Sequence, residues 1–180
     1  MALLQVSLKS QLQKLLGGSA LGLLLLGVQA QAEPIKRTPL PNSKAHILQA
    51  VTLAPGVETV YFSGLLPPPA NPAATTDQLK AEGNTQTQTE AVFKRLADAL
   101  AVQGLNFQDV IQLRIYLVAD PQTGKLDFNG LQQGYRQFFG TDQQPNLPAR
   151  TTVGVASLVL PGALIEIEAI AARWPHQQSQ

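Results

Sequence analysis

The sequence of 180 residues contains no cysteine and only two histidines. Without cysteine, disulfides, thiolate catalysis and cysteine-ligated metals are all excluded. The histidines, His46 and His176, both lie outside the predicted helices and strands. A histidine-based metal site needs several imidazoles brought close together, so we expect no metal in this protein.

Charged residues are also scarce, at 14% of the chain against about 25% in an average soluble protein. The formal net charge is +1, but Lys9 and Lys14 lie in a segment that we expect to be removed. No acidic residue precedes Glu33, so the remaining chain carries 11 basic and 12 acidic residues. Proteins that bind nucleic acid normally carry a basic excess or stripe, so no nucleic-acid partner is expected. Motifs of phosphate loops, dinucleotide folds, zinc proteases and serine hydrolases are likewise missing.

Residues 1–32 have the pattern of a secretory signal peptide. Lys9 and Lys14 supply the positive start, residues 15–28 form an apolar run, and Ala30-Gln31-Ala32 provides a small-residue cleavage site. The alternative is a retained membrane anchor, although the run is shorter than the ~20 apolar residues of a spanning helix. We predict cleavage after Ala32 and a periplasmic or secreted protein that is free of the membrane.

The rest of the chain predicts one domain. Residues 33–44 contain Lys36, Arg37 and several prolines, and they are expected to form an extended linker rather than folded structure. The domain itself is expected to span residues 45–174, followed by a polar tail at 175–180. With 44% hydrophobic residues, this length is ample for a core of its own.

Alternating apolar residues and turn signals predict the order strand, strand, helix, strand, helix, strand, strand, which is an α+β domain with both helices on one face of the sheet. The first two strands are expected to form a hairpin, and so are the last two, around the turn at Pro161-Gly162. The expected elements are strands at 48–53 and 59–63, a helix at 84–102, a strand at 110–118, a helix at 125–139, and strands at 148–153 and 165–171.

The last two strands carry the charges that suggest a function. Arg150 begins the first of them, just after a proline, and Glu166 and Glu168 share one face of the second. An arginine can grip a carboxylate or phosphate through two parallel hydrogen bonds, and a glutamate can orient or activate water. The alternative is that these charges simply face solvent.

These two strands also carry a family resemblance. The run Asn146-Leu147-Pro148-Ala149-Arg150-Thr151-Thr152-Val153, followed by Ile165-Glu166-Ile167-Glu168-Ala169-Ile170-Ala171, resembles the C-terminal signature of the RidA (YjgF-like) reactive intermediate deaminases. The resemblance implies a chorismate-mutase-like fold and a homotrimer with clefts between subunits. It also implies the hydrolysis of reactive enamines and imines, such as 2-aminoacrylate, to a 2-keto acid and ammonia without any cofactor.

Carried over by position, the resemblance gives roles to individual residues. Arg150 is expected to clamp the substrate carboxylate, and Glu166 to orient water or transfer a proton. Ser63 and Gly64, at the end of the second strand, would help to hold the substrate, although Gly64 could merely turn the chain. Gln132 stands where the family has an asparagine in the second helix, and residues 45–50 lack the tyrosine that family members carry there.

Two other functions remain open from the sequence. A non-catalytic module of the same fold could bind small carboxylic acids at the cleft, and the missing tyrosine favours this alternative, whereas Arg150 and Glu166 favour the enzyme. A nuclease, as proposed for some relatives, fits poorly with the near-neutral charge and the predicted export.

Overall fold

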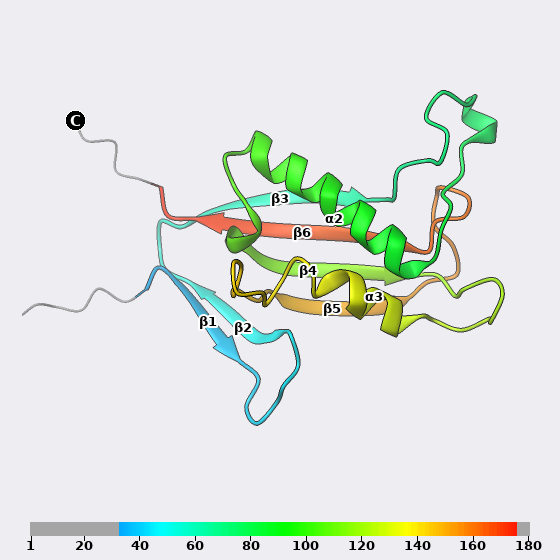
Figure 1. The fold of residues 1–180 in the computed structure, drawn as a ribbon. Coiled ribbons are helices and arrows are strands. Elements are labelled where there is room, and N and C mark those ends of the chain that lie inside the picture. The colour runs from blue at the N-terminus through cyan, green and yellow to red at the C-terminus, as the bar shows by residue number, and fades with distance from the viewer. Residues whose placement is uncertain (1–32, 176–180) are drawn as a thin grey trace, which may run out of the picture. The chain divides into compact units, whose positions relative to one another are not determined.

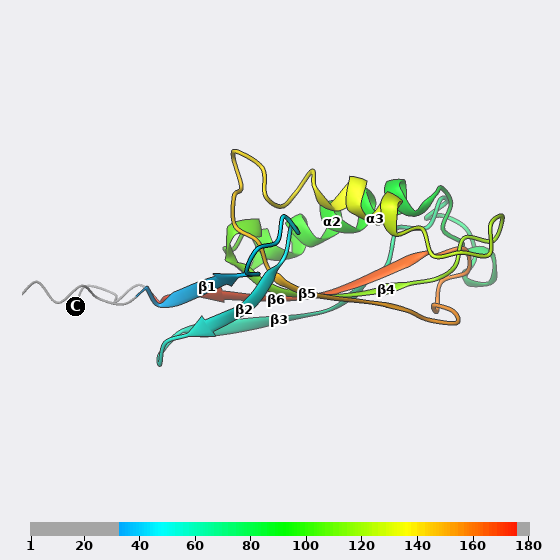
Figure 2. The ribbon, with the colours of Figure 1, turned by 90° about the horizontal axis from the view of Figure 1, so that it is seen from below.

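A computed structural model describes residues 33–175 and confirms the α+β fold. One mixed sheet of six strands carries two helices on a single face (Figures 1 and 2). The strands are β1 (Ile35–Pro39), β2 (Leu48–Leu53), β3 (Glu58–Leu65), β4 (Val110–Leu117), β5 (Ala149–Gly154) and β6 (Ile165–Arg173), and the helices are α2 (Thr85–Val102) and α3 (Phe128–Tyr135). Short 3-10 turns lie at Thr76–Gln78 (η1) and Phe107–Asp109 (η2). The predicted signal peptide and residues 176–180 of the predicted tail lie outside the described residues.

Both predicted hairpins are wrong. The strand order is β1-β2-β5-β4-β6-β3, so β4 lies between β5 and β6, parallel to the first and antiparallel to the second. Similarly, β2 pairs with β1 and β5, whereas β3 pairs with β6 at the opposite edge. Turn residues show where the chain reverses but not which strand it joins next. Alternate residues of β4 are buried, as expected for a strand in the middle of the sheet whose apolar side is covered by helices.

Residues 33–44 are not a linker throughout, because residues 35–39 form strand β1. This strand pairs antiparallel with β2 from Ile35 to Pro39. The Arg37 guanidinium donates to three backbone carbonyls, those of Gln108 (2.7 Å), Leu147 (2.8 Å) and Val110 (3.0 Å). The charge of Arg37, in the segment predicted to be a linker, is thus held by carbonyls near the starts of β4 and β5. The folded unit therefore begins at Glu33 rather than at residue 45.

The helices are placed by their ends. Asn84 caps α2 by accepting a hydrogen bond from the Thr87 N–H (2.9 Å), and Gly104 follows the helix with a φ of 67°. Asp127 caps α3 in the same way through the Gly130 N–H (2.8 Å). The cap explains why α3 begins later than predicted. Beyond Tyr135 the chain tightens into i→i+3 turns, so α3 also ends before residue 139.

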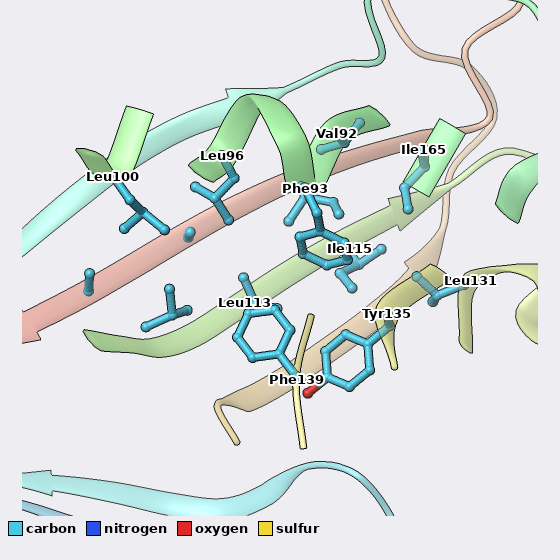
Figure 3. Close-up of a cluster of buried hydrophobic side chains, with 14 of the residues drawn as sticks. Val92, Phe93, Leu96, Leu100, Leu113, Ile115, Leu131, Tyr135, Phe139 and Ile165 are labelled. Carbon is cyan, nitrogen blue, oxygen red and sulfur yellow. The ribbon is translucent and has the colours of Figure 1, made fainter. Parts of the chain in front are cut away.

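The core lies between the helices and one face of the sheet (Figure 3). Alternate residues of β4 and β6 supply its floor, and the apolar stripes of α2 and α3 cover it. Fully buried members include Val92, Phe93, Leu96, Leu100, Leu113, Ile115, Leu131, Tyr135, Phe139 and Ile165. Each large apolar side chain contributes roughly 1.5–3 kcal/mol of transfer free energy.

The opposite face of the sheet is bare of helices (Figure 2), and we call it the open face. Its strands present polar and apolar side chains in turn, including Tyr61, Gln112, Arg114, Tyr116, Val153, Glu166, Glu168 and Ile170. Tyr61 is 73% exposed and Val153 45%, so this face leaves apolar surface uncovered in a single chain. Between residues 33 and 175, no helix has the length and apolarity needed to cross a membrane.

Candidate functional site

Arg150 lies on the face of the sheet that the helices cover. It is paired with Leu113 of β4, which in turn is paired with Ala169 of β6, and both of these partners are buried in the core. Paired residues in neighbouring strands point to the same face, so the guanidinium rises toward α3. Beyond Ala149, β5 has no further register pair with β2, which leaves this edge of the sheet open beside Arg150 (Figure 1).

Helix α3 holds the guanidinium of Arg150 from two directions. Its Nη1 donates to Oε1 of Gln132 (3.1 Å), and its central carbon lies 4.5 Å from the centre of the Tyr135 ring. The ring centre of Phe128, one turn before Gln132, lies 5.8 Å from the same carbon of Arg150. Desolvation lowers the pKa of Arg150, and the neighbouring Arg136 adds to this effect while Tyr135 opposes it. The guanidinium keeps its charge at neutral pH because the ordinary pKa of arginine lies far above 7.

The position of α3 depends on a glycine that lets it approach α2. A Cβ atom at Gly134 would lie 2.8 Å from the side chain of Thr89 and 3.1 Å from the Gln86 carbonyl oxygen. The first separation is too short for a real Cβ and the second is tight, so a larger residue here would force α2 and α3 or the Thr89 side chain to shift. The close approach fixes Gln132 and Tyr135 above Arg150.

Ser63, Gly64 and Glu166 meet at a second place, on the open face. The register of β3 against β6 slips between Phe62 and Leu65, so that Ser63 and Gly64 form a bulge against β6. Glu166 packs on this bulge so closely that a Cβ at Gly64 would collide with its carboxylate. Bulges often occur beside active sites because they redirect side chains and backbone groups. A larger residue at position 64 would therefore displace the Glu166 carboxylate from its place on the bulge.

Glu168 is occupied by contacts within the chain. Its carboxylate accepts hydrogen bonds from Arg114 (3.3 Å) and from the Tyr116 hydroxyl (3.2 Å), both on β4. Desolvation and the Glu168 hydrogen bond raise the pKa of Tyr116, so the phenol remains a donor to the carboxylate. Glu168 is therefore engaged by two side chains of β4, whereas the predicted role of Glu166 as the functional carboxylate stays a prediction.

The predicted residues thus form two groups rather than one. Arg150 and Gln132 lie on the core face, whereas Ser63, Gly64 and Glu166 lie on the open face. We call them the arginine group and the glutamate group. No hairpin joins them, because β4 separates β5 from β6.

Sequence reasoning missed two further candidate residues, Tyr135 and Thr152. Tyr135 lies in the apolar stripe of its helix, and nothing in the spacing shows that an arginine stacks on it. Thr152 lies two residues after Arg150, on the same face. Its buried hydroxyl finds no hydrogen-bond partner among residues 33–175. Threonine is a common strand residue, so this position carried no signal of its own.

Among residues 33–175, no cluster of three or more histidine, aspartate or glutamate side chains could hold a metal ion.

Comparisons with known proteins agree with the arrangement of the fold. The family model described as "Endoribonuclease L-PSP" matches residues 41–173. The protein DfrA of Myxococcus xanthus is 33% identical over 131 residues, which cover 73% of this chain and 88% of DfrA. The mitochondrial protein mmf2 of Schizosaccharomyces pombe is 32% identical over 102 residues, or 56% of this chain and 74% of mmf2.

Two solved structures are similar over most of the chain. The Rid-family protein YyfB of Yersinia pestis superposes with a TM-score of 0.58 at 24% identity and covers 78% of this chain and 100% of YyfB. The E. coli protein TdcF, solved with bound serine, has a TM-score of 0.50 at 26% identity and covers 79% of this chain and 99% of TdcF.

Proposed function

The chain belongs to the Rid (YjgF-like) family, and we propose that it hydrolyses reactive 2-imino acids and their enamine tautomers to 2-keto acids and ammonia. Water adds to the imine carbon, and the carbinolamine that forms then loses ammonia as its C–N bond breaks. One water molecule is consumed and no electrons are exchanged, so the reaction needs no cofactor. The imine carbon is already electrophilic, so correct positioning supplies much of the rate.

The arginine group carries this proposal. Stacking on Tyr135 and the bond to Gln132 hold the guanidinium, and its other N–H groups have no acceptor among residues 33–175. A half-buried arginine with free donors in one plane is suited to a planar carboxylate, such as the C1 group of a 2-imino acid. The similar protein TdcF was solved with bound serine, which also carries a carboxylate beside a nitrogen-bearing carbon.

We propose further that the glutamate group of a second copy completes the site in a homotrimer. Arg150 and Glu166 lie on different faces, so one chain does not place a water-orienting carboxylate over a substrate held by its own arginine. A neighbouring copy can do so across the open edge of β5. The exposed apolar residues of the open face support assembly, because burying such surface stabilises contacts between subunits.

Export of the protein is a separate proposal that depends on residues 1–32. N-terminal sequencing of the protein recovered from the periplasm or medium should find Glu33 as the first residue. A chain that retains Met1 and sediments with membranes would reject cleavage after Ala32.

A second candidate function is binding of small carboxylates without turnover. The lack of a tyrosine at residues 45–50 favours it, because a family group is missing from the entrance of the site. This candidate uses the same arginine group, so catalysis must be measured directly. The family description as an endoribonuclease makes RNA cleavage a further activity to assay.

The deciding experiment uses the protein from Glu33 onward, which retains β1. The enzyme is added to 2-aminoacrylate generated in the same cuvette, and formation of the 2-keto acid is followed against the spontaneous rate. We expect acceleration by the wild type and none by Arg150→Ala. Pyruvate binding without acceleration would support the carboxylate-binding module, and cleavage of RNA that survives Arg150→Ala would point to a site elsewhere.

A further inference from the structure

Tyr135 occupies a position that its apolar helix stripe does not explain. Its side chain is fully buried in the core, yet its hydroxyl donates to the backbone carbonyl of His46 (2.7 Å) and its ring carries the guanidinium of Arg150. On one side it stacks on Phe139, with ring centres 5.0 Å apart and an angle of 16° (Figure 3). One side chain therefore joins the core, the arginine group and the segment that leads into β2.

The segment around His46 is held by two hydrogen bonds near Arg150. The His46 carbonyl accepts from the Tyr135 hydroxyl, and the Leu48 N–H donates to the carbonyl of Pro148 (3.0 Å), two residues before Arg150. The segment thus connects α3 to the start of β5. This is also the part of the chain where family members carry a tyrosine and this chain has none.

The contact with the ring leaves the hydrogen-bonding edges of the guanidinium free. An arginine stacked on an aromatic face keeps its N–H groups in a plane parallel to the ring, where they point outward. Gln132 takes one of them. The ring therefore sets the plane of the fork, and Gln132 sets its rotation within that plane.

We infer that Tyr135 is a positioning residue for Arg150: its ring orients the guanidinium toward the substrate carboxylate, and its hydroxyl ties that orientation to the segment carrying His46. Burial, opposed by the positive charge of Arg150, raises the pKa of Tyr135, so the phenol stays protonated and keeps donating to His46. The part of the inference that concerns the substrate carboxylate rests on the proposed function. The orientation of Arg150 by Tyr135 does not.

Three variants separate the two contacts from packing alone. Tyr135→Phe keeps the ring and loses the hydroxyl, whereas Tyr135→Leu loses both. Phe139→Leu is the matched control, because it removes a ring that is equally buried, one turn later, with no stacking contact to Arg150. All three are compared by thermal unfolding, so that loss of stability can be distinguished from loss of orientation.

The first measurement needs neither substrate nor activity. In ¹⁵N-labelled protein, the Nε–Hε signal of Arg150 is assigned by its absence from Arg150→Lys. We expect a shifted signal in the wild type that Tyr135→Phe retains, that Phe139→Leu retains, and that Tyr135→Leu moves to the position of a free arginine. An unchanged Arg150 signal in Tyr135→Leu would overturn the inference, whether or not the protein is a deaminase.

The second measurement is the affinity for pyruvate and the KM for 2-aminoacrylate. Tyr135→Leu should weaken both by about tenfold, consistent with loss of a desolvated cation–π contact, while kcat changes much less. In an Arg150→Ala background the same change should have no further effect on affinity. An equal effect in that background would show that Tyr135 acts on the core alone and would also overturn the inference.

Discussion

Arg150 and Glu166 lie on opposite faces of one sheet and on strands that do not touch. Arg150 is level with Leu113 of β4 and Glu166 with Tyr116, so they are offset by three residues, or roughly 10 Å, along the strands. They are also separated by the width of β4. Under the proposed function, the arginine and glutamate groups would be two halves of one site that a single chain does not bring together.

The two carboxylates of β6 should differ in their effect on turnover. Glu166→Gln keeps the size and a hydrogen bond but cannot accept a proton, so it should lower kcat more than it raises KM. Glu168→Gln should leave kcat within about twofold, because Glu168 is engaged by Arg114 and Tyr116. Steady-state kinetics on 2-aminoacrylate test the pair. Loss of activity in Glu168→Gln with full activity in Glu166→Gln would reverse the assignment.

Arg150 should not tolerate lysine. Arg150→Lys keeps the charge but loses the planar fork and the stacking on Tyr135, so its affinity for pyruvate should fall nearly as far as in Arg150→Ala. Each lost hydrogen bond to a charged group costs roughly 1.5–3 kcal/mol, which is about tenfold or more in affinity. Calorimetric titration with pyruvate measures the affinity of each variant. Wild-type affinity in Arg150→Lys would show that the site requires only a positive charge.

Thr152 should contribute to binding but not to folding. Its buried hydroxyl has no partner among residues 33–175, so Thr152→Val should leave the free energy of unfolding unchanged or raise it by up to about 1 kcal/mol. If the hydroxyl faces the substrate, the same change should raise KM by about three- to tenfold. Thr152→Ser, which keeps the hydroxyl, is the control and should retain the wild-type KM. Wild-type kinetics in Thr152→Val would remove Thr152 from the site.

Stability should fall at high pH because of Tyr135. The folded-state pKa of this phenol is raised, whereas in the unfolded chain it ionises near its ordinary pKa of about 10. The unfolded state then binds fewer protons, so the stabilising contribution is fully present below about pH 10 and is lost as the pH rises further. Ionisation of one such group can lower the free energy of unfolding by at most about 1.4 kcal/mol per pH unit. Urea unfolding from pH 8 to 11 should show a shallower decline in Tyr135→Phe than in the wild type, and equal slopes would contradict the burial of the phenol.

Much of the fold could be predicted from local pattern, and the errors have physical causes. The alternation in β4 and β6 predicts their faces correctly, because period two depends only on the backbone. Strand pairing depends on contacts between distant segments, so both hairpins were predicted wrongly. Residues 33–44 were predicted to be a linker because the three carbonyl partners of Arg37, at residues 108, 110 and 147, are far away in sequence.

The candidate site, like the fold, could be predicted only where it depends on local pattern. Arg150, Glu166, Ser63 and Gly64 could be named from motifs, and Gln132 could be named from its helical position. The separation of these residues onto two faces could not be predicted, because it follows from the insertion of β4 between β5 and β6. The stacking of Arg150 on Tyr135 could not be predicted either, since it depends on how closely α3 approaches the sheet.

The most direct test of the account is complementation between two inactive variants. Arg150→Ala and Glu166→Gln are co-expressed with different tags, and mixed oligomers are purified through both tags. If each site of a trimer takes its arginine from one copy and its glutamate from the next, every mixed trimer contains one intact site, so the doubly purified oligomers should show about a third of the wild-type activity on 2-aminoacrylate. Pairing Arg150→Ala with the double variant Arg150→Ala/Glu166→Gln supplies no intact arginine and should remain inactive. Mixed oligomers as inactive as their parents, although each variant folds and assembles, would contradict a site shared between copies.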